Sequence, residues 1–112
     1  MDFDCYDVVV VPFPFTDKAQ TKRRPALVLS DHKAFGKKIG HSVLAMITSA
    51  NNPPWPLDVE ITDLKTAGLP APSVIRIKLF TLDNRLIIER RGRLAGKDRK
   101  AVDAALMTML GK

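Results

Sequence analysis

The sequence of 112 residues is poor in cysteine and histidine, with one Cys and two His. A single thiol, Cys5, cannot form a disulfide within the chain, and no signal-peptide pattern stands at its start, so we expect a reducing, cytoplasmic setting. The same scarcity argues against a zinc site, and we predict neither a metal nor another cofactor. No apolar run approaches the roughly 20 residues that a membrane span requires, so we predict no membrane partner.

Acidic residues are also few, with 12 Asp and Glu against 18 Lys and Arg and a net charge of +6. This excess favours a polyanionic partner, nucleic acid first, although simple solubility would explain it as well. The length and the hydrophobic share of 46% suit one compact domain with its own core. We therefore expect a single domain over residues 1–112.

Short β-branched and alternating apolar segments dominate the chain and predict a mainly β protein. Strands are expected over residues 6–11, 25–30, 42–49, 57–62, 73–79 and 85–91. The continuous valines after Tyr6 indicate a strand covered on both faces. The alternation of Leu57, Val59 and Ile61 with polar residues indicates a half-exposed strand.

The connecting segments contain few helical signals before the C-terminal end. Residues 12–24 form a long loop, residues 51–56 a rigid proline-rich loop with the only Trp, and residues 80–84 a turn. Short helical turns are expected within 31–40 and 63–72, and Asp98 is expected to cap a helix ending near Leu110. The order predicts a small, strongly bent antiparallel barrel with the helix packed against it.

One basic stretch stands out, because Lys22, Arg23 and Arg24 run directly into Pro25 and an apolar strand. A guanidinium at the entrance of a rigid strand is suited to grip a phosphate. The alternative is a solvated charge of no special function. His32 and His41 are more simply surface histidines than catalytic bases.

Five segments taken in order resemble the MazF/PemK family of toxins from bacterial toxin–antitoxin modules. They are Asp7–Asp17, Arg24–Ser30, Ile47–Ser49, Pro72–Arg76 and Gly92–Leu94. The resemblance covers nearly the whole chain and implies an SH3-like barrel of the plasmid-maintenance toxin type. It also implies a homodimer, endoribonuclease activity on single-stranded RNA, and neutralisation by a cognate antitoxin.

The resemblance carries the family's active site onto Arg24, the hydroxyl pair Thr48 and Ser49, and Arg76. Two positions depart from the family pattern: Tyr6 stands where Gly is common, and Lys78 where some members have an acidic residue. The resemblance assigns no general base. Asp17 is the one carboxylate within residues 12–24.

We interpret these residues as a site for metal-independent RNA cleavage by the substrate's own 2′-hydroxyl, which leaves 2′,3′-cyclic phosphate and 5′-hydroxyl ends and would inhibit translation and growth. Arg24 would stabilise the phosphorane charge, Thr48 would donate a hydrogen bond with Ser49 in support, and Arg76 would add a second guanidinium. The RNA would be bound by Lys18, Lys22, Arg23, Lys37, Lys38, Trp55 and Lys78.

Two other functions stay open for the chain, and one choice stays open for Trp55. The chain would otherwise be a non-catalytic SH3-like module that binds RNA or protein, or a gyrase poison like a sister branch of the same toxin fold. Trp55 would either stack on a base or cap the proline-rich loop or a dimer face.

Overall fold

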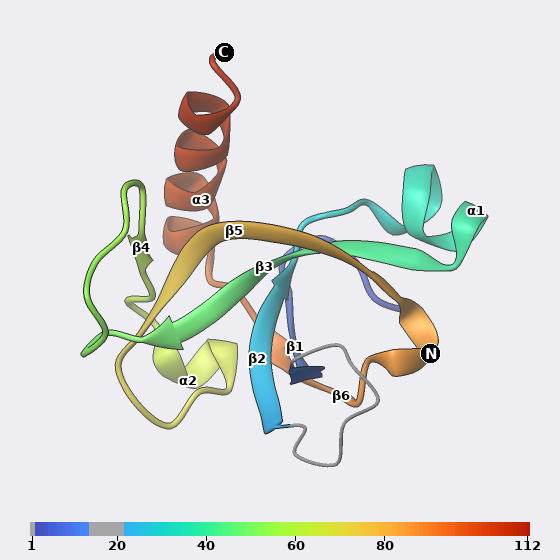
Figure 1. The fold of residues 1–112 in the computed structure, drawn as a ribbon, viewed down its shortest axis with the longest axis horizontal. Helices are drawn as coiled ribbons and strands as arrows, with labels where there is room; N and C mark the ends of the chain where they lie inside the picture. The colour runs from blue at the N-terminus through green and yellow to red at the C-terminus, as the bar shows by residue number, and fades with distance from the viewer. Residues whose placement is uncertain (1, 14–21) are drawn as a thin grey trace.

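Six antiparallel strands form one sheet that curls into a half-barrel (Figure 1). The structure is a computed structural model and describes residues 2–13 and 22–112. The strands are β1 (Asp7–Phe13), β2 (Lys22–Val28), β3 (His41–Ser49), β4 (Val59–Glu60), β5 (Ser73–Asp83) and β6 (Glu89–Arg93), in the spatial order β4-β5-β3-β2-β1-β6. The predicted mainly β barrel with a C-terminal helix is confirmed.

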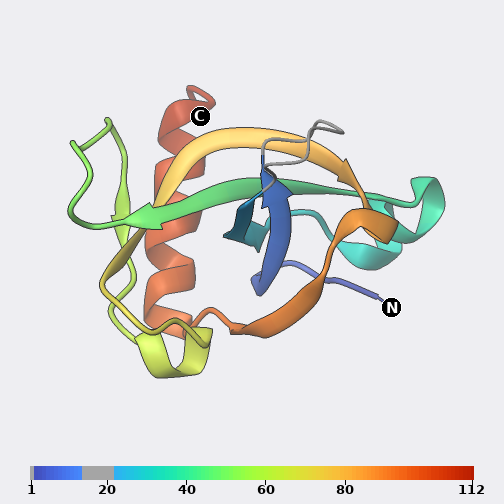
Figure 2. The ribbon, with the colours of Figure 1, turned by 60° about the horizontal axis from the view of Figure 1, so that its bottom comes forward.

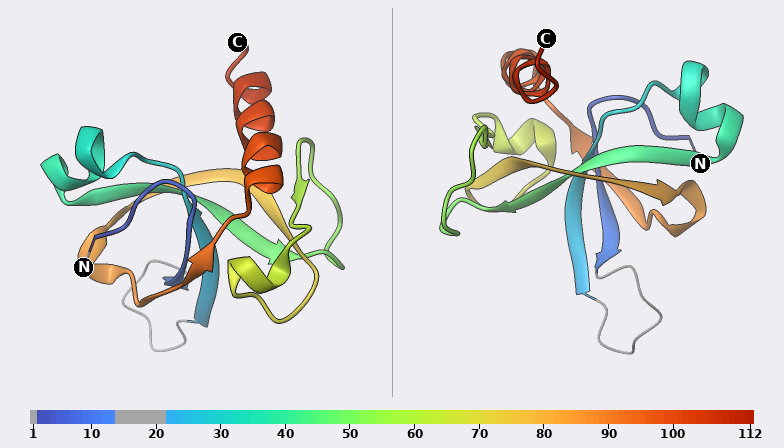
Figure 3. Two further views of the ribbon diagram at one scale, coloured as in Figure 1. Left: turned by 180° about the vertical axis from the view of Figure 1, so that it is seen from behind. Right: turned by 45° about the horizontal axis from the view of Figure 1, so that its top comes forward.

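The helical elements are short except for the last. A π-helical turn over His32–Gly36 leads into α1 (Lys37–Ile39), α2 is Leu64–Ala67, a 3₁₀ turn covers Asn84–Leu86, and α3 is Gly96–Met109. Figures 2 and 3 show α3 standing against one side of the curled sheet. Within the described residues, no helix is long and apolar enough to cross a membrane.

Each face of the sheet has its own core. Val8 and Leu27 pack in a cluster that includes Val102 of α3, whereas Val9 and Val11 pack on the other face. The alternation of side chains along a strand explains how the valine run of β1 serves both clusters. The predicted coverage of this strand on both faces is therefore confirmed, since Val8, Val9 and Val11 are each 0% exposed.

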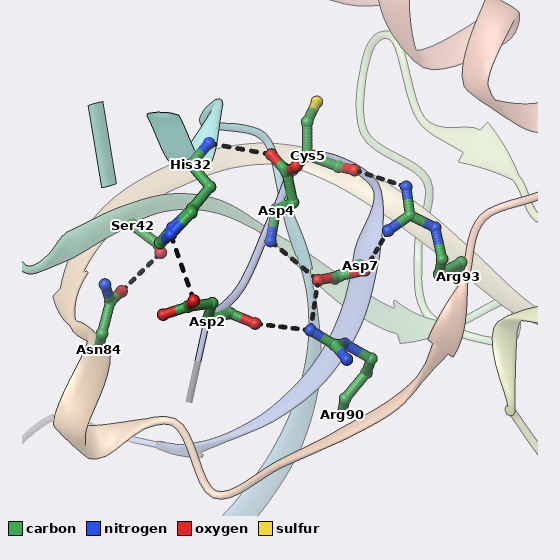
Figure 4. Close-up of polar contacts among 9 residues, drawn as sticks. All are labelled: Asp2, Asp4, Cys5, Asp7, His32, Ser42, Asn84, Arg90 and Arg93. Atoms are coloured by element: carbon green, nitrogen blue, oxygen red, sulfur yellow. Dashed lines mark hydrogen bonds and ion pairs between the residues drawn. The ribbon is translucent and has the colours of Figure 1, made fainter. Parts of the chain in front are cut away.

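A buried carboxylate fastens the chain's start to β6, in a cluster that we call the N-terminal corner: Asp4, Asp7, Arg90 and Arg93 (Figure 4). Asp7 is fully buried, and its two oxygens lie 2.8 Å from Nη1 of Arg93 and 3.1 Å from Nη2 of Arg90. The amide of Asp4 donates a further bond of 2.8 Å to Asp7. Every oxygen of this carboxylate is thus partnered, which burial of a charge requires.

Two glycines let α2 touch β6. A Cβ atom at Gly92 would lie 2.4 Å from the carbonyl oxygen of Thr66, and one at Gly68 would lie 2.2 Å from the carbonyl oxygen of Arg91. Gly68 also ends α2 with φ 73°, in the left-handed region that favours glycine. This contact brings the segment after α2 next to β6, where one hollow of the site forms.

The structure corrects several expectations about elements. Residues 80–83 continue β5 instead of turning, because β3 pairs along its whole length and holds them, from Ser49 with Ser73 to His41 with Asp83. Residues 57–62 contain strand only at Val59–Glu60, since Leu57 has φ 67°, which a strand cannot accommodate.

The prediction of a strand over residues 85–91 is also partly wrong. Asp83 caps the 3₁₀ turn over Asn84–Leu86, and β6 begins only at Glu89. Asp98 does not cap α3, which begins at Gly96 after Ala95. Asp98 is buried and accepts bonds from the amide and hydroxyl of Thr62 and from the amide of Asp63. It therefore ties α3 to the segment after β4.

Candidate active site

The sheet opens where β2 begins and β3 ends. These strands pair only between Ala26–Val28 and Leu44–Met46. Continuing that register two residues further places Arg24 across from Thr48, but the strands have already separated, as Figures 1 and 3 show. We call the two diverging segments, residues 22–25 and 47–49, the fork. Arg24 and Thr48 therefore lie at equivalent positions on its two prongs.

A hollow lies on one side of the fork, with a cavity volume of about 280 Å³. Its polar lining comprises Arg23, Arg24, Thr48, Ser49, Ser73 and Arg91, and its apolar lining comprises Val10, Pro25, Ile47 and the segment Leu69-Pro70-Ala71-Pro72. We call it the first hollow. Guanidinium groups and hydroxyls thus border an apolar floor.

A second hollow lies on the other side, with a cavity volume of about 200 Å³. It is lined by Phe13, Arg24, Met46, Ile47, Thr48, Asn52, Trp55, Arg76 and Lys78. Arg24, Ile47 and Thr48 line both hollows, so the hollows adjoin at the fork, with Arg24 and Thr48 as the polar side chains of this junction. We call the two hollows together the groove.

Thr48 is held ready to donate a hydrogen bond. Its hydroxyl oxygen accepts a bond from the side-chain amide of Asn52, which follows β3 by three residues. Because that oxygen is already an acceptor, its own proton remains available for a ligand. Ser49 instead accepts a bond of 3.2 Å from the amide of Asn51, so its hydroxyl stabilises the turn after β3.

Arg76 lines the second hollow but is fixed by protein groups. Its Nη2 lies 3.1 Å from a carboxylate oxygen of Asp58, and it donates a bond of 2.9 Å to the carbonyl of Pro53. Its side chain is only 12% exposed, and its guanidinium lies 5.0 Å from the centre of the Trp55 ring. Arg76 therefore anchors the proline-rich loop, and most of its hydrogen-bonding capacity is used there.

Asp58 completes this anchor. Burial alone would raise the pKa of Asp58, but bonds from the Arg76 guanidinium and the Trp55 amide together hold that pKa below its usual value. The Trp55 ring is 45% exposed, and the Lys78 amine lies 5.8 Å from its centre. The loop thus presents an aromatic face beside a cation, which suits stacking of a base.

The other predicted RNA-binding cations divide into two groups. Lys22 and Arg23 are exposed at the start of β2, next to Arg24. Lys37 and Lys38 lie in α1, beyond the opposite end of β3, and the strand from His41 to Thr48 spans roughly 23 Å. The structure therefore does not bring α1 to the fork. Lys18 and Asp17 lie outside the described residues.

Among the described residues, neither hollow is lined by a carboxylate or a histidine. His41 begins β3 and His32 lies in the π-helical turn, both away from the fork. No group of His, Cys, Asp or Glu within the described part of the chain is placed to hold a metal ion. The electrostatic character of the groove is set by Arg23, Arg24, Arg91 and Lys78, which favours an anionic ligand.

Sequence reasoning missed three residues of this site: Asn52, Asp58 and Arg91. Asn52 follows the strand-end hydroxyls at a spacing typical of a turn, which was the available signal. Asp58 is 18 residues from its partner Arg76, and no local pattern indicates that contact. The placement of Arg91 at the first hollow depends on the pairing of β6 with β1, which no local sequence pattern predicts.

Comparison with solved structures finds the same fold. A MazF of Deinococcus radiodurans is 24% identical over 100% of this chain and 99% of its own, with a TM-score of 0.78. A MazE–MazF complex from the same organism gives 25% identity over 99% and 98%, with a TM-score of 0.79. A mycobacterial endoribonuclease in complex with its cognate antitoxin gives 16% identity over 98% and 94%, with a TM-score of 0.75.

No curated protein matches the sequence. The family model described as "PemK-like, MazF-like toxin of type II toxin-antitoxin system" matches residues 4–110, nearly the whole chain. The curled sheet, the C-terminal helix and this match agree with the resemblance noted in the sequence. The chain belongs to the PemK-like, MazF-like toxin family of type II toxin–antitoxin systems.

Proposed function

We propose that this toxin is a metal-independent endoribonuclease that cleaves single-stranded RNA, messenger RNA above all, in the cytoplasm. The observation that carries the proposal is the fork. Arg24 and Thr48 both line the junction of two hollows whose described lining holds cations and no carboxylate. A phosphodiester with a nucleotide on either side fits this arrangement of one junction and two flanking spaces.

In the proposed reaction the 2′-hydroxyl oxygen attacks the neighbouring phosphorus. A bond forms between phosphorus and O2′, the bond from phosphorus to O5′ breaks, and the proton of the 2′-hydroxyl passes through solvent water to O5′. The products are a 2′,3′-cyclic phosphate and a 5′-hydroxyl. The transition state places additional charge on the non-bridging oxygens. Arg24 can bind these oxygens with two parallel N–H groups, and Thr48 can donate a third hydrogen bond.

Two further groups have supporting parts in this proposal. Ser49 braces the turn that positions Asn52, the residue that orients the Thr48 hydroxyl. Arg76 holds Trp55 at the wall of the second hollow, where a base could stack on the exposed ring. Lys22 and Arg23 would attract the RNA backbone on its way to the fork.

We also propose that the toxin acts as a homodimer and is neutralised by a cognate antitoxin. The resemblance to the family supports both statements. Structures titled as MazE–MazF complexes and as an endoribonuclease with its cognate antitoxin share the fold of this chain. The net charge of +6 suits an acidic antitoxin segment.

Incubation of the purified protein with a long RNA tests the catalytic proposal. We expect cuts at a limited set of sequences, with 2′,3′-cyclic phosphate and 5′-hydroxyl ends, in the presence of a metal chelator. Arg24→Ala should retain the fold and lower kcat by about 10²–10³-fold, the usual effect of removing one donor to a developing oxyanion. Arg85→Ala is the matched control, because the Arg85 side chain is 89% exposed and lies outside both hollows.

Intact RNA after long incubation, together with salt-sensitive binding, would instead indicate a non-catalytic RNA-binding module. Inhibition of purified gyrase without RNA cleavage would indicate a gyrase poison. An Arg24→Ala variant that cleaves RNA at the rate of the unaltered protein would remove Arg24 from the mechanism.

A further inference from the structure

Arg91 reaches the first hollow because of a β-bulge. β1 and β6 pair as Val8 with Gly92 and Val9 with Arg90, so Arg91 is the additional residue on β6 at that step. An additional residue of this kind re-aims its side chain relative to the regular alternation of the strand. Arg91 accordingly lines the first hollow.

The backbone at the bulge is fixed from the other side by α2. A Cβ atom at Gly68 would lie 2.2 Å from the carbonyl oxygen of Arg91, and one at the next residue, Gly92, would lie 2.4 Å from the carbonyl oxygen of Thr66. These contacts hold the bulge against the end of α2. The position of Arg91 is therefore set by the fold and does not depend on a ligand.

The charge balance around Arg91 favours an anion. Arg23, Arg24 and Arg91 border the first hollow, and no carboxylate lines its described surface. The carboxylate paired with Arg91 is Glu89, at 3.3 Å, and both side chains are about half exposed, at 49% and 51%. An exposed pair of this type contributes little and exchanges readily for another anion.

The apolar part of the hollow's lining is stiff. It comprises Leu69, Pro70, Ala71 and Pro72 together with Val10 and Pro25, and the prolines restrict its shape. A ligand that fits must combine an anionic group with a compact apolar surface. A nucleotide has this combination, since its phosphate is charged and the face of its base is apolar.

We propose that Arg91 binds the phosphate of the nucleotide next to the cleaved bond, and that the first hollow holds the base of that nucleotide. This inference rests on the proposed endoribonuclease function and names one of its substrate-binding residues. Arg91 is a positioning residue, because it would fix the RNA relative to Arg24 and Thr48 without contacting the reacting atoms.

The first test measures binding apart from catalysis. A fluorescent 2′-O-methyl RNA cannot be cleaved by 2′-hydroxyl attack, and its affinity can be followed by anisotropy at several salt concentrations. We expect Arg91→Ala to weaken binding about tenfold and to reduce the slope of log K against log salt by about 0.7, as loss of one phosphate contact on a single strand predicts. Arg91→Lys should recover part of the affinity and the salt slope, and Arg85→Ala should change neither.

Cleavage kinetics then separate positioning from chemistry. With cleavable RNA, Arg91→Ala should raise KM about tenfold and change kcat less than Arg24→Ala does. Unchanged affinity and salt slope in Arg91→Ala would overturn the inference even if the protein cleaves RNA. Failure of the unaltered protein to cleave RNA would instead overturn the proposed function, whatever the variant shows.

The second test fills the hollow. Ala71→Trp places a large side chain at its exposed rim, and Ala104→Trp makes the same change on the exposed surface of α3. We expect Ala71→Trp to weaken RNA binding severalfold and Ala104→Trp to leave it unchanged. If Ala71→Trp and Arg91→Ala weaken only antitoxin binding and not RNA binding, the hollow is a protein-binding site and the inference is wrong.

Discussion

Strand β6 carries arginines in two opposite situations. Arg90 and Arg93 are 43% and 47% exposed and both bind the fully buried Asp7. Arg91, between them, has a similar exposure of 49% but is paired, among the described residues, with the half-exposed Glu89. The bulge at Arg91 separates the two situations, because it directs this side chain to the first hollow while its neighbours serve the N-terminal corner.

The difference shows that residue type and exposure do not determine what an arginine does. In the N-terminal corner the carboxylate is buried and its partners are fixed, so the charges are matched within the protein. In the first hollow the guanidinium groups have no buried counter-charge among the described residues, which leaves them to attract an external anion. Arg76 is intermediate, since it lines the second hollow but is bound by Asp58.

The largest effect is expected when the buried carboxylate of Asp7 is removed from the N-terminal corner. We expect Asp7→Ala to lower the free energy of unfolding by about 3 kcal/mol, the low end for breaking a buried ion pair, because both arginines can rehydrate. Urea unfolding measures this change. RNA cleavage by the folded fraction should remain, since Asp7 is not in the lining of either hollow.

Glu60→Ala is the matched control for that experiment. Glu60 is an exposed carboxylate on the short strand β4, where removal of a side chain costs little. Equal stability losses in Asp7→Ala and Glu60→Ala would contradict the view that the N-terminal corner is the matched, structural set of charges.

The second prediction concerns Arg76, which would change from an arginine paired within the protein to one that can attract an external anion. Asp58→Asn removes the counter-charge of Arg76 and should lower the free energy of unfolding by about 2 kcal/mol, because the two side chains are only 12% and 13% exposed. The released guanidinium should then strengthen binding of 2′-O-methyl RNA and increase its salt slope. This is the reverse of the change expected for Arg91→Ala.

The pH dependence of the free energy of unfolding tests how much the charge of Asp58 stabilises the protein. The folded-state pKa of Asp58 lies below the unfolded value of about 4, so the stabilisation is present above pH 4 and is lost as pH falls through the folded value. The stability gap between the unaltered protein and Asp58→Asn should therefore close in strong acid. A gap that stays constant as pH falls from 7 to well below 4 would mean that the charge of Asp58 does not hold the loop.

Local sequence patterns were sufficient to predict many of the strands, but not which residues pair between strands. The valines of β1 and the run that becomes β3 were predictable because β-branched and apolar residues pack well on both faces of a sheet. Residues 80–83 were taken for a turn because their strand conformation depends on β3, which pairs with them after a register shift at Ala45 and Met46.

The residues of the candidate site likewise fall into those that local patterns could predict and those that only the fold places. The positions of Arg24 and Thr48 could be stated from motifs, since each lies at the end of a strong strand signal. Arg91 could not, because its placement follows from a bulge and from the contact between Gly68 and β6. Asp58 was expected on the polar face of a half-exposed strand, but it lies before β4 with its side chain only 13% exposed, because Arg76 on β5 binds it and only the fold brings the two together.

The smallest predicted effect concerns Tyr6, which stands beside the N-terminal corner where the family commonly has glycine. Its φ of 74° lies in the left-handed region that favours glycine. Its hydroxyl donates to both carboxylate oxygens of Asp103 on α3, at 2.7 and 2.9 Å, and the Arg99 guanidinium lies 5.0 Å from its ring centre. The Tyr6 side chain therefore holds α3 in place, although the backbone of Tyr6 itself has a conformation that is unfavourable for residues other than glycine.

Tyr6→Phe removes only the hydroxyl and should lower the free energy of unfolding by about 0.5–1 kcal/mol at neutral pH. The hydrogen bond to Asp103, with burial adding to it, raises the pKa of Tyr6, so the folded protein keeps this proton when the unfolded chain loses it near pH 10. The hydroxyl's contribution is thus complete below about pH 10 and is lost as pH rises further. Because the chain has one tyrosine, the difference between the two proteins isolates this group. Urea unfolding at pH 7 and pH 11 should show the gap narrowing, and a gap that widens at pH 11 would contradict the assigned bond.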